Sequence, residues 1–277
     1  MSWLTQKRLS RLLRLIGYVS PSLAAEIAVW RFTTPNPIAR PEWEKQLIAK
    51  GERLQFKNGT RGTVWGPKDA PAVMLVHGWQ GRGAQLGKLV DPLLERGFRV
   101  VAWDGPAHGD SPGRRANLRL FAELLAGAVG EVGTVRSVVA HSFGAGATAL
   151  ALARGWMEVQ RVVLVAAPAE FEWVIAGHCR RFKVLPKVEA AFRRKLEAFT
   201  GLKIEEMGIA KMAESIEKPA LVIHDEEDDE VPFSEGQKIV RHWRGAKLLP
   251  LKGCGHRKIL KSPDFIEAVL DFVGSAA

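Results

Sequence analysis

A serine, a histidine and a run of acidic residues follow three separate apolar segments, and together they have the residue types of a nucleophilic site. Ser142 stands in "VVAHSFGAGA" (138–147), between an apolar run and a cluster of small residues. A serine hydroxyl needs a neighbouring base to take its proton before it can attack an ester. His256 in "LKGCGHRK" (251–258) has the chemistry of that base. The acidic run in "PALVIHDEEDDEVP" (219–232) supplies a carboxylate that would orient the histidine.

Apolar runs that alternate with helical segments predict the elements that must position these residues. Strands that are apolar throughout indicate a mostly parallel sheet with helices on both faces, which is an α/β fold. Two β-rich runs around Asn58-Gly59 predict a hairpin that adds an antiparallel edge. The expected buried strands cover 71–78, 98–105, 137–142, 161–168, 219–226 and 246–253, and the expected helices include 84–96, 116–130 and 263–274. The strand ends share one edge of such a sheet, so the serine, the acidic run and the histidine are expected to meet there.

The corner at Ser142 fits a sharp turn from a strand into a helix. Such a turn exposes the hydroxyl at a helix N-terminus, where negative charge is favoured, and it needs small neighbours. The usual pattern is Gly-x-Ser-x-Gly, and this chain has Ala140-His141-Ser142-Phe143-Gly144. The alternative is an ordinary strand-to-helix turn with a capping serine.

From about residue 52 onward the chain resembles the α/β-hydrolase fold family, in which this turn is called the nucleophile elbow. The resemblance rests on five segments in order: "HGWQGRG" (77–83), "DGPAHGDS" (104–111), "AHSFGAG" (140–146), "HDEEDDEVP" (224–232) and "GCGH" (253–256). It implies a serine hydrolase of the carboxylesterase kind that acts on a small-molecule ester through a Ser-His-Asp catalytic triad and an acyl-enzyme intermediate. Thioester, lactone, peptide and carbon–carbon bond hydrolysis stay open.

The resemblance also implies individual roles. The family's acid motif, laid onto residues 224–232, puts Asp228 at the catalytic position, with Glu170 as a less favoured acid. The oxyanion hole is expected from the backbone amides of Phe143 and Trp79, with Gln80 as an alternative to Trp79. We expect Trp173 in the substrate pocket.

The neighbouring His141 is expected either to line that pocket or only to pack there. No histidine shows metal-ligand spacing, and we expect neither a metal nor a cofactor.

The stretch between Pro168 and Pro219 breaks the alternation, because it has many apolar residues and no clear strand. Long structureless loops are uncommon in compact domains, so this stretch predicts a small helical cap. The predicted organisation is an N-terminal helical arm over 1–50, a hydrolase core over 51–169 and 219–277, and a cap domain over 170–218.

The N-terminal segment is basic and amphipathic. Residues 1–61 hold 11 Lys and Arg against 4 Asp and Glu, within a chain whose formal net charge is +10. A helical stripe of Leu9, Leu12, Leu13 and Ile16 is expected to pack on the hydrolase. An anionic membrane surface is the less favoured partner of this helix. No nucleic-acid motif accompanies the charge, so we expect no nucleic-acid partner.

Two other functional classes compete with the hydrolase. One is a non-enzymatic protein of the same fold that binds a ligand or signals, since a fold does not fix a function. The other is a dinucleotide-binding protein, suggested by Gly81-x-Gly83-x-x-x-Gly87 with Asp104 at the end of the next strand. The chain has only two cysteines, which suits a reducing compartment, so we expect a cytoplasmic location.

Overall fold

A single eight-stranded sheet forms the centre of the molecule in a computed structural model that describes residues 3–36 and 38–275. The strand order is β1-β2-β4-β3-β5-β6-β7-β8. β1 pairs with β2 and β2 with β4 in antiparallel fashion, and every later pair is parallel. The strands are β1 (Glu52–Gln55), β2 (Arg61–Trp65), β3 (Ala72–Val76), β4 (Arg99–Asp104), β5 (Val135–His141), β6 (Arg161–Val165), β7 (Ala220–Asp225) and β8 (Lys247–Leu251). The predicted fold class, a mostly parallel sheet with helices on both faces, is confirmed.

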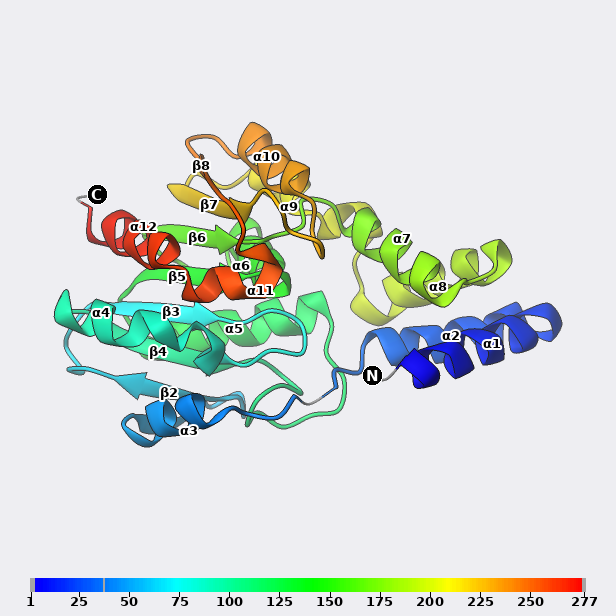
Figure 1. The fold of residues 1–277 in the computed structure, drawn as a ribbon, viewed down its shortest axis with the longest axis horizontal. Helices are drawn as coiled ribbons and strands as arrows, with labels where there is room; N and C mark the ends of the chain where they lie inside the picture. Colours follow the sequence, from blue (N-terminus) through cyan, green and yellow to red (C-terminus); the bar gives the residue numbers. More distant parts are fainter. Residues whose placement is uncertain (1–2, 37, 276–277) are drawn as a thin grey trace.

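Helices connect the strands and cover the sheet (Figure 1). Capping supports some of their starts; the Asn117 side chain, for example, accepts a hydrogen bond of 2.8 Å from the Leu120 amide at the start of α5. The α-helices are α1 (Trp3–Val19), α2 (Pro21–Phe32), α3 (Glu42–Ala49), α4 (Val90–Glu95), α5 (Leu118–Val132), α6 (Phe143–Ala153), α7 (Phe171–Phe182), α8 (Pro186–Thr200), α9 (Ile209–Ala213), α10 (Phe233–His242), α11 (Gly255–Lys258) and α12 (Pro263–Gly274). Short 3₁₀ helices are η1 (Gly83–Leu89), η2 (Ile204–Met207) and η3 (Ile259–Lys261). Within the described ranges, none of these helices combines the length and the apolar character needed to cross a membrane.

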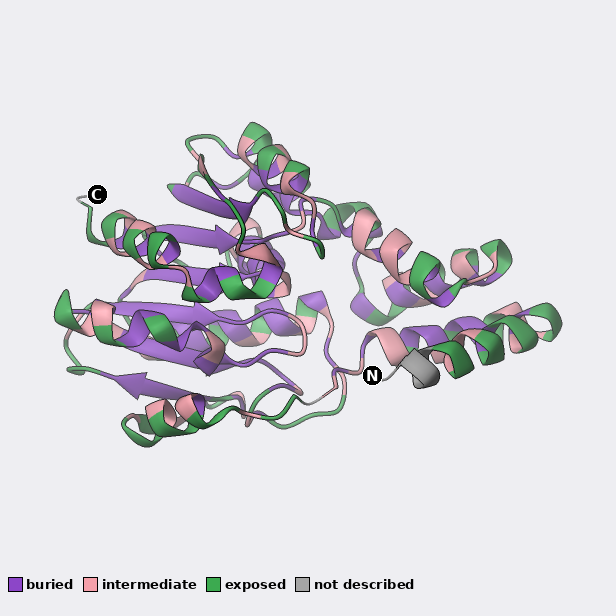
Figure 2. Ribbon diagram, viewed as in Figure 1, coloured by how far each residue is buried: buried purple, intermediate pink, exposed green. Residues whose placement is uncertain are grey.

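The sheet separates two apolar cores, because successive side chains of a strand point to opposite faces. In β3, Met74 and Val76 enter the core that α5 and α6 cover. Val73 and Leu75 enter the other core, under η1, α4 and α12. All four side chains are fully buried, and Figure 2 shows the central strands in the colour of buried residues. This double burial explains why the strands are apolar throughout.

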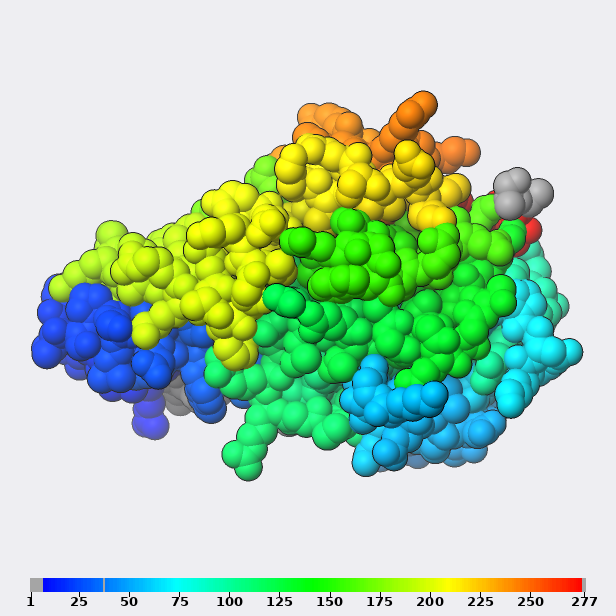
Figure 3. All heavy atoms as spheres, turned by 180° about the vertical axis from the view of Figure 1, so that it is seen from behind, coloured from blue at the N-terminus to red at the C-terminus, as the bar shows by residue number. Residues whose placement is uncertain are grey.

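Four helices project from the sheet as a separate lobe. Figure 1 shows α1 and α2 beside α7 and α8, and Figure 3 shows the same projection from behind. The Ser10 hydroxyl donates a 2.6 Å hydrogen bond to the Phe182 carbonyl, and the rings of Phe32 and Phe192 lie 5.5 Å apart edge to face. We call these four helices the helical lobe.

The helical lobe does not include every helix of the predicted arm and the predicted cap. Helix α3, inside the predicted arm of 1–50, packs on η1 of the sheet body. Helix α9, inside the predicted cap of 170–218, packs on α6 and α10. The predicted packing stripe of α1 is also wrong at one position. Leu13 is buried and Leu9 and Ile16 are partly buried, whereas Leu12 is 48% exposed, because the inward side of α1 is narrower than the stripe.

A buried ion pair joins α3 to the sheet body. The Arg82 guanidinium forms two hydrogen bonds with the Glu44 carboxylate, one of them 3.0 Å between Nη2 and Oε1. Both side chains are almost completely buried, and Arg82 Nη1 also donates to the Ile38 carbonyl at 3.0 Å. Removing one member of such a pair leaves the other charge buried without its counter-ion.

We therefore predict that Glu44→Ala lowers the free energy of unfolding by about 3–5 kcal/mol, measured by denaturant titration. Glu42→Ala is the matched control, because Glu42 lies on the same helix and forms an exposed pair with Lys45. That control is expected to change stability by less than about 1 kcal/mol. Equal effects of the two substitutions would contradict the role given to the buried pair.

Candidate active site

Ser142 occupies the turn between β5 and α6 in a strained backbone conformation. Its φ is +50° and its ψ is −116°, values that a residue with a side chain rarely adopts. The Ser142 amide donates a 2.8 Å hydrogen bond to the Val165 carbonyl of β6, which fixes the turn to the sheet. The geometry directs a half-buried hydroxyl to the carboxyl edge of the sheet, at the start of a helix.

Small residues allow neighbouring chain segments to approach this turn. A Cβ atom on Gly144 would collide with the His77 carbonyl oxygen. A Cβ atom on Gly78 would lie 2.8 Å from His141 Nδ1 and 3.1 Å from Ser142 Cβ. Ala140, which replaces the first glycine of the usual pattern, is fully buried in the apolar core, so its methyl group is accommodated.

The structure brings His256 and Asp228 to Ser142. His256 lies on α11, just after β8, and its Nε2 is 3.2 Å from Ser142 Oγ. Its Nδ1 is 2.9 Å from Asp228 Oδ2, on the loop after β7. The Nδ1–H therefore donates to the carboxylate, which leaves Nε2 free to accept the serine proton. The three predicted residues form one continuous hydrogen-bonded chain.

The environment of Asp228 keeps its carboxylate ionised. Burial of the side chain would raise its pKa, but the hydrogen bond with His256 and the amides of Val231 and Glu230 outweigh burial and hold the pKa below its usual value. Both amides donate to Oδ1 at 2.8 Å. Asp228 Oδ1 therefore accepts hydrogen bonds from its own loop, and Oδ2 accepts the hydrogen bond from His256.

The other acids considered from the sequence have different partners. Asp225 is fully buried, and its carboxylate accepts hydrogen bonds from the amides of Glu227 at 2.8 Å and Cys254 at 2.7 Å. It therefore ties the acid loop to the segment that precedes His256. Glu170 pairs with Lys238 at 3.1 Å, and Asp229 is exposed at the cavity rim.

His141 holds the segment that carries His256 through a hydrogen bond to its backbone. Burial lowers the pKa of His141 to about 3, so its ring is neutral at ordinary pH. Its Nε2 lies 2.9 Å from the His256 carbonyl and must donate the proton, because a carbonyl only accepts. The ring also borders the cavity at Ser142, so the expected pocket position and the expected packing role coincide in one residue.

His224 supports the loop that carries Asp228. The sequence identifies His224 only as the end of a strand. Its Nε2 lies 2.9 Å from the Val231 carbonyl and 3.5 Å from Asp228 Oδ2. The sequence could have suggested this role only through the position of a histidine at the end of a strand, next to an acidic loop. That position does not show which backbone carbonyl accepts the hydrogen bond from the ring.

Two backbone amides near Ser142 are available to bind a negatively charged oxygen. Among the hydrogen bonds of the described residues, none has the Phe143 or the Trp79 amide as its donor. The Gln80 amide donates to His108 Nε2 at 3.0 Å and is therefore already used. The rings of Trp79 and Phe143 contact each other edge to face at 5.1 Å.

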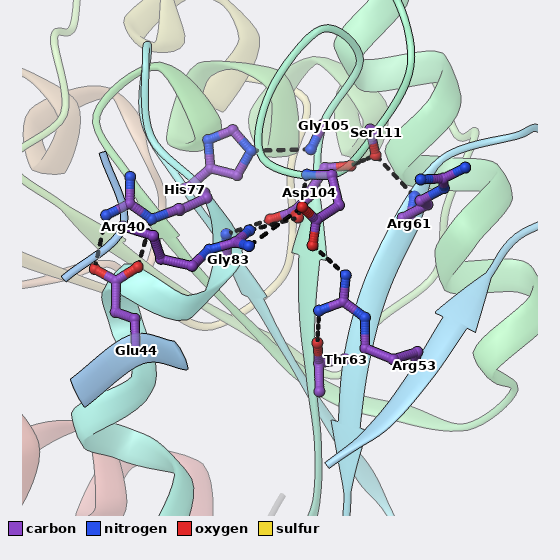
Figure 4. Close-up of polar contacts among 12 residues, drawn as sticks. Arg40, Glu44, Arg53, Arg61, Thr63, His77, Gly83, Asp104, Gly105 and Ser111 are labelled. Carbon is purple, nitrogen blue, oxygen red and sulfur yellow. Dashed lines mark hydrogen bonds and ion pairs between the residues drawn. The ribbon is translucent and has the colours of Figure 1, made fainter. Parts of the chain in front are cut away.

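His77 and the buried Asp104 carboxylate anchor the segment that follows β3, as Figure 4 shows. His77 Nδ1–H donates to the Gly78 carbonyl at 2.7 Å, and its Nε2 accepts from the Gly105 amide at 2.9 Å. Burial lowers the pKa of His77 to about 4, which keeps Nε2 an acceptor. Asp104, the acid of the dinucleotide alternative, instead accepts hydrogen bonds from the amides of Gly83 and Asp110.

A cavity of about 780 Å³ opens over Ser142 and His256. Its wall includes the predicted pocket residue Trp173, together with Phe171 from α7. The cavity also uses residues that the sequence analysis assigned to the arm, such as Phe32, whose ring lies 6.2 Å from that of Phe171. Among the described residues, no group of three His, Cys, Asp or Glu side chains is arranged to hold a metal ion.

Comparisons with known proteins agree with this architecture. Residues 73–204 match the model of the alpha/beta hydrolase family. The bifunctional esterase/perhydrolase DCH of Acinetobacter calcoaceticus is 28% identical over 241 residues, which is 69% of this chain and 87% of that protein.

Two solved esterases share the fold. The esterase EaEST from Exiguobacterium antarcticum superposes with a TM-score of 0.62 at 17% identity, over 81% of this chain and all of that one. The Pyrococcus furiosus esterase Pf2001 superposes with a TM-score of 0.63 at 19% identity, over 87% of this chain and 95% of that one. The sheet, the turn at Ser142 and these likenesses together show that the chain has the α/β-hydrolase fold.

Proposed function

We propose that the protein is a carboxylic ester hydrolase that uses Ser142 as its nucleophile, His256 as its base and Asp228 as the acid that orients His256. The observation that carries the proposal is the hydrogen-bonded chain from Ser142 Oγ through His256 to Asp228, in which Ser142 and His256 line the cavity. The likeness to the Acinetobacter relative, a bifunctional esterase/perhydrolase, supports the same class of reaction.

The first half of the reaction forms an acyl-enzyme. Ser142 Oγ attacks the ester carbonyl carbon while its proton passes to His256 Nε2. The amides of Phe143 and Trp79 donate to the oxygen that becomes negative. The carbon–oxygen bond to the alcohol then breaks, and His256 returns the proton to the departing alcohol oxygen.

The second half releases the acid. His256 takes a proton from water, whose oxygen attacks the acyl carbon of the Ser142 ester. The intermediate collapses, Ser142 Oγ recovers its proton from His256, and the carboxylic acid leaves. Asp228 stabilises the positively charged imidazole in both halves and does not itself take up a proton.

The substrate of this proposal is a small-molecule ester that enters the cavity. Trp79, Phe143, Phe171 and Trp173 provide an apolar aromatic wall, which favours acyl or alcohol groups with apolar surface. A panel of nitrophenyl esters of increasing acyl length, with a thioester and a lactone, measures which bond and which chain length are preferred.

Substitutions in the hydrogen-bonded chain test the proposed roles. Ser142→Ala is expected to lower kcat by about 10⁶ with nitrophenyl esters, because the nucleophile is lost. Asp228→Asn is expected to lower kcat by about 10⁴, because an amide nitrogen facing His256 Nδ1 favours the wrong tautomer. Asp229→Asn is the matched control on the same loop and is expected to retain activity. Full activity of Ser142→Ala with unchanged thermal unfolding would refute the proposed nucleophile.

A glycine substitution tests the proposed oxyanion hole separately. Gly78→Ala would push the loop that carries the Trp79 amide away from Ser142, because the new Cβ atom meets His141 and Ser142. The expected result is a loss of about 10²-fold or more in kcat, the cost of misplacing one oxyanion donor. The control is Gly130→Ala on α5, where a Cβ atom has no neighbour within 4 Å. Equal kcat values for the two variants would exclude this role of the loop.

A further inference from the structure

Exposed apolar side chains gather on the first two helices of the lobe. The described residues include nine large apolar side chains that are exposed, and six of them lie on α1 and α2. These six are Leu12, Leu15, Tyr18, Val19, Leu23 and Trp30. Concentrations of exposed apolar surface on a soluble fold commonly mark an interaction site.

Helix α1 has two apolar faces, and among the described residues only the inner one is buried by packing. Leu13 is 2% exposed and packs inward. Leu12, Leu15 and Val19 are 48%, 68% and 89% exposed. Their spacing of i, i+3 and i+7 puts these three side chains on one side of the helix. Packing of α1 against the other helices of the lobe therefore does not explain why the second face is apolar.

The same outer face carries positive charge. Arg8 precedes Leu12 by four residues and Arg11 precedes Leu15 by four, so each arginine lies one turn before an exposed leucine. The helix sequence contains four basic residues and no acidic one. Within the described part of the chain, no carboxylate forms an ion pair with Arg8, Arg11 or Arg14. We call Arg8, Arg11, Leu12, Leu15 and Val19 the outer face of α1.

The position of α1 leaves this face accessible. The turn between α1 and α2 lies at the far end of the lobe from the sheet (Figure 1). Figure 2 shows exposed residues along α1, and Figure 3 shows the lobe projecting from the body. Lys187 of α8 adds a cation at this end, with its Nζ 3.3 Å from the Tyr18 carbonyl and 5.8 Å from the centre of the Tyr18 ring.

We propose that the outer face of α1 docks the protein on membranes that contain anionic lipids. Leucine and valine side chains would enter the boundary between headgroups and acyl chains, while Arg8 and Arg11 meet the lipid phosphates. Charge complementarity favours this occupant over a second copy of the chain, which would bring two uniformly basic helices together. This inference is independent of the proposed catalysis, because vesicle binding is measured without turnover.

Vesicle sedimentation of the full chain tests the proposal. The protein is expected to sediment with phosphatidylcholine vesicles that contain phosphatidylglycerol, and much less with phosphatidylcholine alone or at high salt. Leu15→Ser/Val19→Ser is expected to weaken this binding about tenfold or more, since both side chains are exposed and the fold does not use them. Arg8→Glu/Arg11→Glu is expected to weaken it by about tenfold or more as well.

A charge-matched control separates the outer face from the net charge of the chain. Lys68→Glu/Arg244→Glu makes the same change in charge at exposed positions on the sheet body and is expected to bind vesicles as the unaltered protein does. Unchanged thermal unfolding in each variant shows that the fold is intact. Failure to sediment with anionic vesicles at low salt, or undiminished binding of Leu15→Ser/Val19→Ser, would overturn the proposal. So would a dimer that Leu15→Ser/Val19→Ser dissociates, which would assign the face to a second copy.

Discussion

The positive φ of Ser142 is the constraint around which the site is built. A side chain in this conformation costs of order 1–3 kcal/mol, so the surroundings must hold it. The hydrogen bond to β6 holds it from one side, and the close approach of Gly78 and Gly144 to neighbouring backbone holds it from another. Because β5 lies in the centre of a doubly covered sheet, the strained turn is attached to a fully buried part of the core.

Loops with buried polar anchors surround this turn. His141, His224 and Asp225 fasten the loops that carry His256 and Asp228, and His77 fastens the loop that carries Trp79. Burial keeps the pKa of His77 and of His141 low, so each ring donates one fixed hydrogen bond instead of gaining charge near the site. The proposed chemistry therefore also depends on residues that take no part in the bond changes, and displacement of their loops would impair it as loss of Ser142 would.

The sequence predicted those parts of the fold that depend on local patterns. Apolar runs predicted the strands, and the order of motifs at their ends predicted that Ser142, Asp228 and His256 would meet. It did not predict that β4 lies between β2 and β3, because strand order depends on contacts between distant segments. The contribution of Phe32 to the cavity was missed for the same reason, since its ring contact is with Phe171 of another helix.

The error at Leu12 has a different physical origin. Helical spacing shows which residues share a side of a helix, but not how wide a strip the neighbouring elements cover. Here α1 packs against α2 and α7 with Leu13 buried and Leu12 exposed. The apolar surface that stays exposed on α1 is the basis of the proposed membrane contact.

Mass spectrometry after reaction with a serine-directed phosphonate tests the central account most directly. The account predicts one covalent adduct on Ser142, formed rapidly in the unaltered protein and far more slowly in His256→Ala, because the base is needed to remove the hydroxyl proton. Absence of any adduct, an adduct on another residue, or an unchanged rate in His256→Ala would contradict it.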